Sequence, residues 1–340
     1  MAALQPSQES VPDAGHPFSP TSNEDSPPDV ILRSNDRVDF HVHKAILAFA
    51  SNLFKGMFSI TEPTGEQANI VKDGKSVVSL DESSRVIGIL LTLIYPPTIC
   101  TRDSLQLDGV DAAYKAADFY QFHGAQQLLE QLLEEPRFLD KEPYRVFAIS
   151  CHRGLEKQAK AAAMATLKLR RFVPNSTVPE FEYMTAHKLY QLGEFRSKCS
   201  DAIVERLEQL TNIIDAANCA EDPDSSSSFE PVWWLNKDHG PGCGPTCFDG
   251  PGDSGSWVEP AWWFRAHIAN VKKAAELCPS LGSVWIALHT IDEPILKSMS
   301  SCPTCVNGAQ SSLSLLIRHD LDSQATQAQQ QLLAHYTFAN

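Results

Sequence analysis

Two pairs of closely spaced cysteines are the residues whose types and spacing point most directly to chemistry. Cys302 and Cys305 are separated by two residues, Cys243 and Cys247 by three, and both pairs lie in turns marked by glycine or proline. Thiolates presented on such turns can hold one tetrahedral zinc ion. The helical segment predicted between the pairs can fold back and bring the four sulfur atoms together. The sequence therefore predicts a structural zinc site in the C-terminal part of the chain.

Other interpretations of these cysteines remain open. The thiols are either ordinary groups in a loop or a redox-sensitive pair, and His239, four residues before Cys243, can substitute for one thiolate. A catalytic zinc ion is a further alternative, and it needs an open coordination position and a nearby carboxylate base. Asp249 and Asp253 are near in sequence. Four thiolate ligands would indicate a structural site, so the coordination number separates the two kinds of zinc protein.

Apart from this cluster, the sequence contains no recognisable catalytic constellation. We find no glycine-rich loop that would cradle a phosphate, no paired catalytic carboxylates and no nucleophile with an identifiable base. We therefore predict that the chain is not an enzyme, and we keep a zinc-dependent enzyme as the alternative.

Composition and charge narrow the possible partners. The chain has 340 residues, enough for two domains with tails, and its net charge of −14 disfavours binding to nucleic acid phosphates. The longest mostly apolar run, 86–94, is far shorter than a membrane span, and residues 1–28 contain no apolar segment typical of a secretory signal. Nine scattered cysteines suit a reducing compartment. We expect a soluble protein of the cytoplasm or nucleus that binds neither nucleic acid nor membrane.

The most informative stretch of the chain runs from Phe40 to Phe58. Its beginning alternates apolar and polar residues, which is the period of a half-buried strand, and from His43 the apolar residues recur at helical spacing. Ser51 can cap a second short helix through its hydroxyl. A strand at Asp29 and a turn at 34–36 complete a hairpin followed by two helices.

These residues resemble the BTB/POZ domain family. The family pattern has an Asp-Val-x-Leu strand, a turn, and then a Phe-x-x-His-Lys segment that continues into two helices. The slots of this pattern are filled by Asp29, Val30, Leu32, Phe40, His43, Lys44, Leu47, Ser51, Phe54, Met57 and Phe58. The later segments around 77–95 and 110–122 resemble the strand and helices that follow in the family. The resemblance implies a short β-sheet flanked by helices.

The same resemblance implies a homodimer and a set of interface residues. Family dimers form a pocket at the interface, lined by an Asp that opens the first strand and a Lys or Arg after the His, and these slots hold Asp29 and Lys44. We assign these two residues, with His43, Leu47 and Phe54, to the dimer interface. In the alternative interpretation, Asp29 and Lys44 form a surface pair worth little and His43 is a structural histidine held by hydrogen bonds.

The remaining chain is predicted to be mainly helical, so the fold class is α+β with most residues in helices. The predicted parts are a disordered tail (1–28), a BTB/POZ domain (29–135), a helical extension (136–215), a linker with a Cys-, Gly- and Pro-rich loop (216–256) and a helical C-terminal region (257–340). Tryptophans at 233, 234, 257, 262 and 263 form either a partner surface or, as we favour, a small C-terminal core.

The function that these observations favour is protein–protein interaction. An interaction domain that homodimerises, followed by a helical region, resembles the substrate adaptors of cullin-type ubiquitin ligases and the scaffolds of transcriptional regulation. The adaptor is the more concrete of the two, because no DNA-binding motif follows the BTB-like unit.

Overall fold

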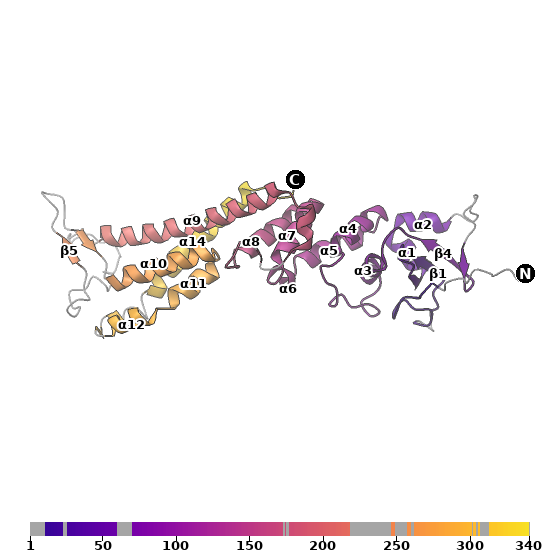
Figure 1. The fold of residues 1–340 in the computed structure, drawn as a ribbon, viewed down its shortest axis with the longest axis horizontal. Coiled ribbons are helices and arrows are strands. Elements are labelled where there is room, and N and C mark those ends of the chain that lie inside the picture. Colours follow the sequence, from indigo (N-terminus) through magenta and orange to yellow (C-terminus); the bar gives the residue numbers. More distant parts are fainter. Residues whose placement is uncertain are drawn as a thin grey trace, which may run out of the picture. The chain divides into compact units, whose positions relative to one another are not determined.

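The structure is a computed structural model of the whole chain, and its fold is drawn in Figure 1. It describes residues 11–22, 26–59, 70–172, 174, 177–217, 246–248, 257–259, 262–300, 302–303, 305–306 and 313–339. The chain divides into two compact units, the first unit (1–158) and the second unit (159–340), and the division falls inside helix α8 (Glu156–Thr166).

The first unit contains a four-stranded sheet with the order β2-β1-β4-β3. Strand β1 (Val30–Arg33) pairs antiparallel with β2 (Asp39–Val42) and parallel with β4 (Lys75–Ser79), while β3 (Val71–Lys72) pairs antiparallel with β4. Three consecutive apolar residues of β1 are buried, as is typical of a strand covered on both faces. Strand β3 has only two residues, which are too few to leave a strand pattern in the sequence.

Two helices follow β2 directly, as the change of period in the sequence predicted. Helix α1 (Lys44–Ala50) ends at Ser51, and α2 (Asn52–Ser59) begins there. The Ser51 hydroxyl accepts a hydrogen bond from the Phe54 amide at 3.1 Å, which is the predicted cap, and donates one to the Tyr120 carbonyl at 2.6 Å. The serine therefore ties the helix junction to the end of α4.

The other helices of the first unit complete its core beside the sheet (Figure 1). They are α3 (Ser84–Ile94), α4 (Val110–Phe119), α5 (His123–Leu133), α6 (Pro136–Leu139) and α7 (Pro143–Arg153). Helix α3 is apolar on most of its surface and stops before Pro96-Pro97, because proline cannot continue a helix. Gly124 lies in the first turn of α5.

The prediction of a disordered tail over 1–28 is wrong for residues 11–22. Asp13 forms a parallel bridge with Asp39 of β2, the Asp39 amide donates to the Pro12 carbonyl at 2.9 Å, and the His41 amide donates to the Phe18 carbonyl at 2.9 Å. Phe18 is buried. Backbone hydrogen bonds do not depend on side-chain type, and for this reason a polar, proline-rich composition did not reveal the segment. Residues 1–10 and 23–25 lie outside the described part.

The second unit is mainly helical, with helices of very different length. They are α8, the short 3₁₀ helix η1 (Pro179–Tyr183), α9 (Ala186–Ala217), α10 (Trp262–Leu277), α11 (Leu281–His289), α12 (Glu293–Met299) and α14 (Leu313–His335). Helices α9, α10 and α14 lie side by side in Figure 1. Their core contains Ile203, Leu207, Trp263, Phe264 and Val271. The core role that we favoured for the tryptophans therefore holds for Trp263.

The second unit also contains a two-stranded ribbon. Strand β5 (Thr246–Phe248) pairs antiparallel with β6 (Trp257–Glu259). The sequence analysis placed 246–248 in a Cys-, Gly- and Pro-rich loop and 257–259 at the start of a helical region, so it predicted neither strand. Thr246, Cys247 and Phe248 are neither glycine nor proline, so they can pair through their backbone.

Buried Arg196 joins three carbonyl groups in the second unit. Its guanidinium donates to the Thr166 carbonyl at 2.5 Å, to the Leu277 carbonyl at 2.7 Å and to the Leu169 carbonyl. Thr166 and Leu277 are the last residues of α8 and α10, where helix carbonyls lack partners and carry partial negative charge. One cation therefore satisfies the ends of two helices.

Candidate functional site

Of the residues that the sequence analysis assigned to a dimer interface, some make hydrogen bonds near the surface and others are buried in the core of the first unit. Asp29 is exposed, and its carboxylate accepts a hydrogen bond of 2.7 Å from the Lys44 backbone amide. This bond satisfies an amide at the start of α1, where amides lack partners within the helix. The Lys44 ammonium lies over the Phe58 ring, 5.8 Å from its centroid. The hydrogen bond between Asp29 and Lys44 is thus a helix cap.

His43 is held by hydrogen bonds on both ring nitrogens. Its Nδ1 lies 3.0 Å from the Tyr95 hydroxyl, which also accepts from the His43 amide at 3.0 Å, and its Nε2 lies 2.8 Å from the Ser26 carbonyl. A carbonyl can only accept, so Nε2 carries a proton and Nδ1 accepts from the hydroxyl. Burial raises the pKa of Tyr95 to about 12, which keeps this hydroxyl a donor. His43 therefore has the structural role that we considered as its alternative.

Leu47 and Phe54 do not fit the interface to which we assigned them. They are 0 % and 1 % exposed, and Phe54 packs against Tyr120 and Phe122 inside the first unit. Both side chains are buried in the core of their own unit, so neither has exposed surface that could contact a second copy. The assignment followed the family slots, which do not distinguish core from interface.

The exposed face of α1 carries a residue that the sequence analysis missed. Phe49 is 95 % exposed, the highest value among the large apolar residues that are exposed in the described part of the chain. Ala45 is exposed and Ala48 half-buried on the same short helix. The available signal was the helical position of Phe49, which lies outside the stripe formed by Ile46, Leu47 and Ala50.

A cluster of charged side chains joins strands β1, β2 and β3 to the segment 11–22. We call Asp13, Arg33, Asp39, His41 and Lys72 the Asp39 cluster. Asp39 is fully buried and receives Arg33 Nε at 2.7 Å, Arg33 Nη2 at 2.9 Å and Lys72 Nζ at 2.8 Å. Lys72 Nζ also donates to Asp13 Oδ1 at 2.7 Å, and His41 Nε2 lies 3.0 Å from the same oxygen. The two carboxylates and the two permanent cations balance in charge.

Hydrogen bonding in the Asp39 cluster favours the ionised form of each acid. Desolvation alone would raise the pKa of Asp39, but the hydrogen bonds from Arg33 and Lys72 outweigh it and hold that pKa below its usual value. Desolvation would likewise raise the pKa of Asp13. The hydrogen bonds with Lys72 and His41 outweigh it, and the pKa of Asp13 is lowered. The cluster fastens the segment 11–22 to β2 and β3, and the sequence analysis did not find it.

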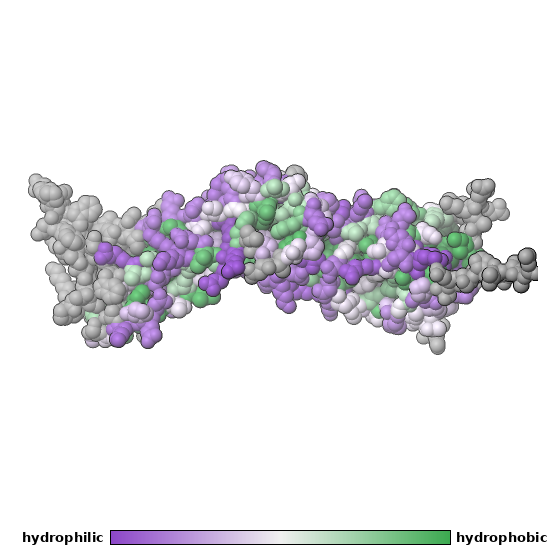
Figure 2. Space-filling view, in the orientation of Figure 1, coloured by the Kyte–Doolittle hydropathy of each residue, from purple (hydrophilic) through white to green (hydrophobic). Residues whose placement is uncertain are grey.

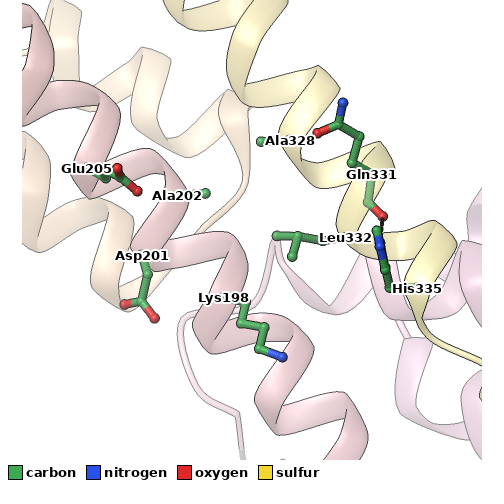
Figure 3. A pocket seen from close by; sticks show the side chains of 8 residues that line it. All are labelled: Lys198, Asp201, Ala202, Glu205, Ala328, Gln331, Leu332 and His335. Carbon is green, nitrogen blue, oxygen red and sulfur yellow. Dashed lines mark hydrogen bonds between the residues drawn. The ribbon is translucent and has the colours of Figure 1, made fainter.

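The second unit has an open groove between α9 and α14, shown in Figure 3. Its volume is about 370 Å³. Ala202, Ala328 and Leu332 supply its apolar part, and the polar residues around it are Lys198, Asp201, Glu205, Gln331 and His335. Such a lining suits the side chains of a protein segment better than a small apolar ligand, which is usually enclosed. On the face drawn in Figure 2, hydrophilic and hydrophobic residues are interspersed.

The four cysteines predicted to bind zinc are only partly described. Cys302 and Cys305 are buried in the core of the second unit, whereas Cys243 and the side chain of Cys247 lie outside the described residues, as do His239, Asp249 and Asp253. Among the residues that the structure describes, no three His, Cys, Asp or Glu side chains are grouped to hold a metal ion. The zinc site therefore stays a prediction.

No described helix is both long and apolar enough to cross a membrane.

The first unit combines a short mixed sheet, a helical pair after its hairpin and an exposed aromatic residue on α1. The family model for the BTB/POZ domain matches residues 18–137, and the chain is therefore a BTB domain-containing protein with a protein-interaction module. The match starts at Phe18, inside the segment that pairs with β2. No curated protein matches the chain significantly.

Proposed function

We propose that the first unit is a homodimerisation module and that the second unit holds a protein partner. The observation that supports dimerisation is the exposure of Phe49 on α1. A nearly fully exposed phenylalanine loses up to about 3 kcal/mol of burial free energy compared with an interior position. Ala45 and Ala48 beside it are small enough for another helix to approach closely. A twofold interface would bring this surface together with its own copy.

An interface of ordinary size covers roughly 800 Å² on each partner, and its centre is apolar and aromatic. Helix α1 has only seven residues, so neighbouring surface must contribute, with Phe49 as the central anchor. A few well-packed residues near the centre carry most of the binding energy in measured interfaces. Leu47 and Phe54 contribute to this interface only indirectly, because their burial in the core fixes the position of α1.

Sedimentation of the full chain at low micromolar concentration tests dimerisation. We expect a dimer for the unaltered chain and at least a tenfold weaker dimer for Phe49→Asp, which corresponds to about 1.4 kcal/mol. Ile286→Asp is the matched control, because Ile286 is also an exposed apolar residue but lies in the second unit. A monomeric unaltered chain, or a dimer indifferent to Phe49→Asp, would refute the proposed interface.

The second part of the proposal is a role as substrate adaptor of a cullin-type ubiquitin ligase, with a scaffold in transcriptional regulation as the alternative. The α9–α14 groove supports it by offering a concave, partly apolar surface at which a partner's side chains could be held. Ala202→Arg would fill this groove with a long charged side chain. We expect it to release the partner of the second unit from affinity-purified chain while the dimer persists. Recovery of the intact chain without any cullin would exclude the adaptor and leave the scaffold.

We also propose a structural zinc ion held by Cys243, Cys247, Cys302 and Cys305. Cys302 and Cys305 support it by their separation of three positions and by their location in the interior of the second unit. Metal analysis of chain purified without chelator should give one equivalent of zinc, and Cys302→Ser should abolish it. Absence of zinc from the unaltered chain would contradict the site, and a coordination sphere with an open position would favour the zinc-enzyme alternative instead.

A further inference from the structure

The α9–α14 groove is lined by two matching stripes of side chains, one from each helix. Along α9 the lining residues stand at positions 198, 201, 202 and 205, and along α14 at 328, 331, 332 and 335. Both sets have the spacing i, i+3, i+4 and i+7, which is one face of a helix. Because each stripe covers about two turns, the groove follows the helix pair for roughly 10 Å.

Small and aliphatic residues form the floor of this groove. Ala202 comes from α9, Ala328 and Leu332 come from α14, and all three are half-buried. Figure 3 shows Leu332 extending from α14 towards α9. The distance between packed helices depends on the side chains at the contact and is shortest where these are small. A third helix can therefore lie against this floor and cover apolar surface of both α9 and α14.

The α9 side of the groove is acidic. Asp201 and Glu205 are exposed and lie one helical turn apart. Within the described part of the chain, no hydrogen bond or ion pair engages the Asp201 carboxylate. Lys198 stands at the end of the same stripe, but its Nζ lies 3.0 Å from Glu194 Oε1 and 5.4 Å from the centroid of the Tyr336 ring. The charge of this lysine is thus balanced by an acid that does not line the groove.

The α14 side of the groove carries no permanent charge. Its polar lining residues are Gln331 and His335. His335 Nδ1 lies 2.7 Å from the Gln331 backbone carbonyl, which can only accept, so Nδ1 carries a proton. The neutral ring then offers Nε2 as a hydrogen-bond acceptor. Together with the carboxylates of α9, this side of the groove suits an occupant that brings hydrogen-bond donors and positive charge.

The cation that these acceptors fit is a basic side chain rather than a metal ion. A metal ion needs several ligands that converge on one point, and no three His, Cys, Asp or Glu side chains do so among the residues that the structure describes. Lysine and arginine instead lay their long apolar stems along a surface and reach a carboxylate with the charged end. Exposed acids beside a half-buried apolar floor therefore favour an occupant that is both apolar and basic.

We propose that the α9–α14 groove binds an amphipathic helix of a partner protein, with small or aliphatic residues at i, i+3, i+4 and i+7 and lysine or arginine on the flank that faces α9. This inference rests on the proposed role of the second unit in holding a partner, and it names the chemistry of that partner. The apolar face of the helix covers Ala202, Ala328 and Leu332, and its cations lie against Asp201 and Glu205. Amphipathic helices bind in grooves in other recognition domains, where complementary charges fix their register.

Two labelled peptides that differ only in the charge of one flank test the proposal with the full chain. Each is a helical peptide of about 14 residues with alanine and leucine at i, i+3, i+4 and i+7. The basic peptide has lysine on one flank of this stripe, and the acidic peptide has glutamate there. In fluorescence anisotropy at low salt, we expect the basic peptide to bind at least about tenfold tighter than the acidic one. Equal binding of the two peptides, or absence of binding by the basic peptide, would overturn the proposal.

Reversing the charge of the α9 side should reverse this preference. In Asp201→Lys/Glu205→Lys we expect the acidic peptide to bind tighter, and in Ala202→Arg neither peptide should bind, because the new side chain fills the groove. The matched control Glu276→Lys/Glu293→Lys makes the same change in net charge at exposed positions that do not line the groove, and it should keep the preference for the basic peptide. An unchanged preference in Asp201→Lys/Glu205→Lys, or its loss in the control, would place the attraction elsewhere on this acidic chain and overturn the proposal.

A milder variant and the natural partner separate the remaining outcomes. If Asp201→Lys/Glu205→Lys does not fold, Asp201→Asn/Glu205→Gln should abolish the preference for the basic peptide, and a persisting preference would contradict the proposal. A partner that the purified chain loses in Ala202→Arg but retains in Asp201→Asn/Glu205→Gln would overturn the basic flank and leave the proposed function standing. A partner retained by Ala202→Arg would contradict both. A change of oligomeric state in Ala202→Arg would identify a second copy as the occupant and likewise overturn the proposal.

Discussion

Replacing Asp39 by Asn should destabilise the first unit by about 3 kcal/mol, because a buried charged group loses its partner. Asp39 accepts three hydrogen bonds from two cations and is itself fully buried. An asparagine keeps the shape but offers one neutral acceptor and turns an amide donor towards a cation. Arg33 and Lys72 would then share Asp13 as the only acid of the cluster.

The magnitude follows from the surroundings of each charge. Breaking a buried pair costs about 3–5 kcal/mol, whereas a surface pair contributes at most about 1 kcal/mol. The side chains of Arg33 and Lys72 are 19 % and 26 % exposed, so water can partly compensate them and the lower end of the range applies. For a unit of this size, each kcal/mol lowers the melting temperature by about 2–4 °C, and a decrease of roughly 6–12 °C is expected.

The distribution of tryptophan makes the assay specific for one unit. All six tryptophans of the chain lie after residue 159, so tryptophan fluorescence follows the second unit, whereas hydrogen exchange of β1 and β2 follows the first. Asp39→Asn should destabilise the first unit and leave the fluorescence transition unchanged. Asp13→Asn should cost less, since Asp13 is 34 % exposed. A loss below about 1 kcal/mol for Asp39→Asn would show that the cluster behaves as a surface network and would refute this reasoning.

Three further predictions concern single side chains. Asp29→Ala should cost about 1 kcal/mol of stability by removing the cap of α1, whereas Asp29→Asn should cost little, because asparagine also caps helices; urea denaturation of both variants checks this. Hydrogen bonds from Ser34 and Ser84 lower the pKa of Asp36 to about 2, below its unfolded value near 3.9. Its stabilising contribution is therefore complete above about pH 4 and lost as the pH falls towards 2, so Asp36→Asn should weaken the acid dependence of unfolding in this range. Arg196→Lys should lower the stability of the second unit by about 2 kcal/mol, since an ammonium cannot reproduce the planar fork, and a fluorescence transition at unchanged temperature would contradict this role.

Local patterns predicted the core of the BTB/POZ domain well. The change from alternation to helical spacing at His43 located β2 and α1, and the hydroxyl of Ser51 was identified as a cap from its position alone. Helix α3 was equally clear, because eleven mostly apolar residues precede two prolines. In each case the determining interactions lie within a few residues in sequence, so the sequence carries them directly.

Contacts between distant residues were the ones that sequence patterns did not reveal. The Asp39 cluster joins Asp13, Asp39 and Lys72 from three separate segments, and nothing in their spacing indicates that they meet. The ordered segment at Phe18 was missed because an average over a polar stretch hides a single buried ring. Leu47 and Phe54 were misassigned because a family slot does not state what covers a side chain.

The pairing of α9 with α14 has a consequence for the order in which the second unit can form during synthesis. Helix α9 precedes α14 by roughly a hundred residues, which a ribosome adds in about 5–20 s. During this time Phe195, which packs edge-on against Tyr336 and Phe338 in the finished fold, has no aromatic neighbour from the later segment. A nascent chain therefore leaves this part of α9 uncovered for seconds, an interval in which exposed apolar surface is prone to association with other molecules.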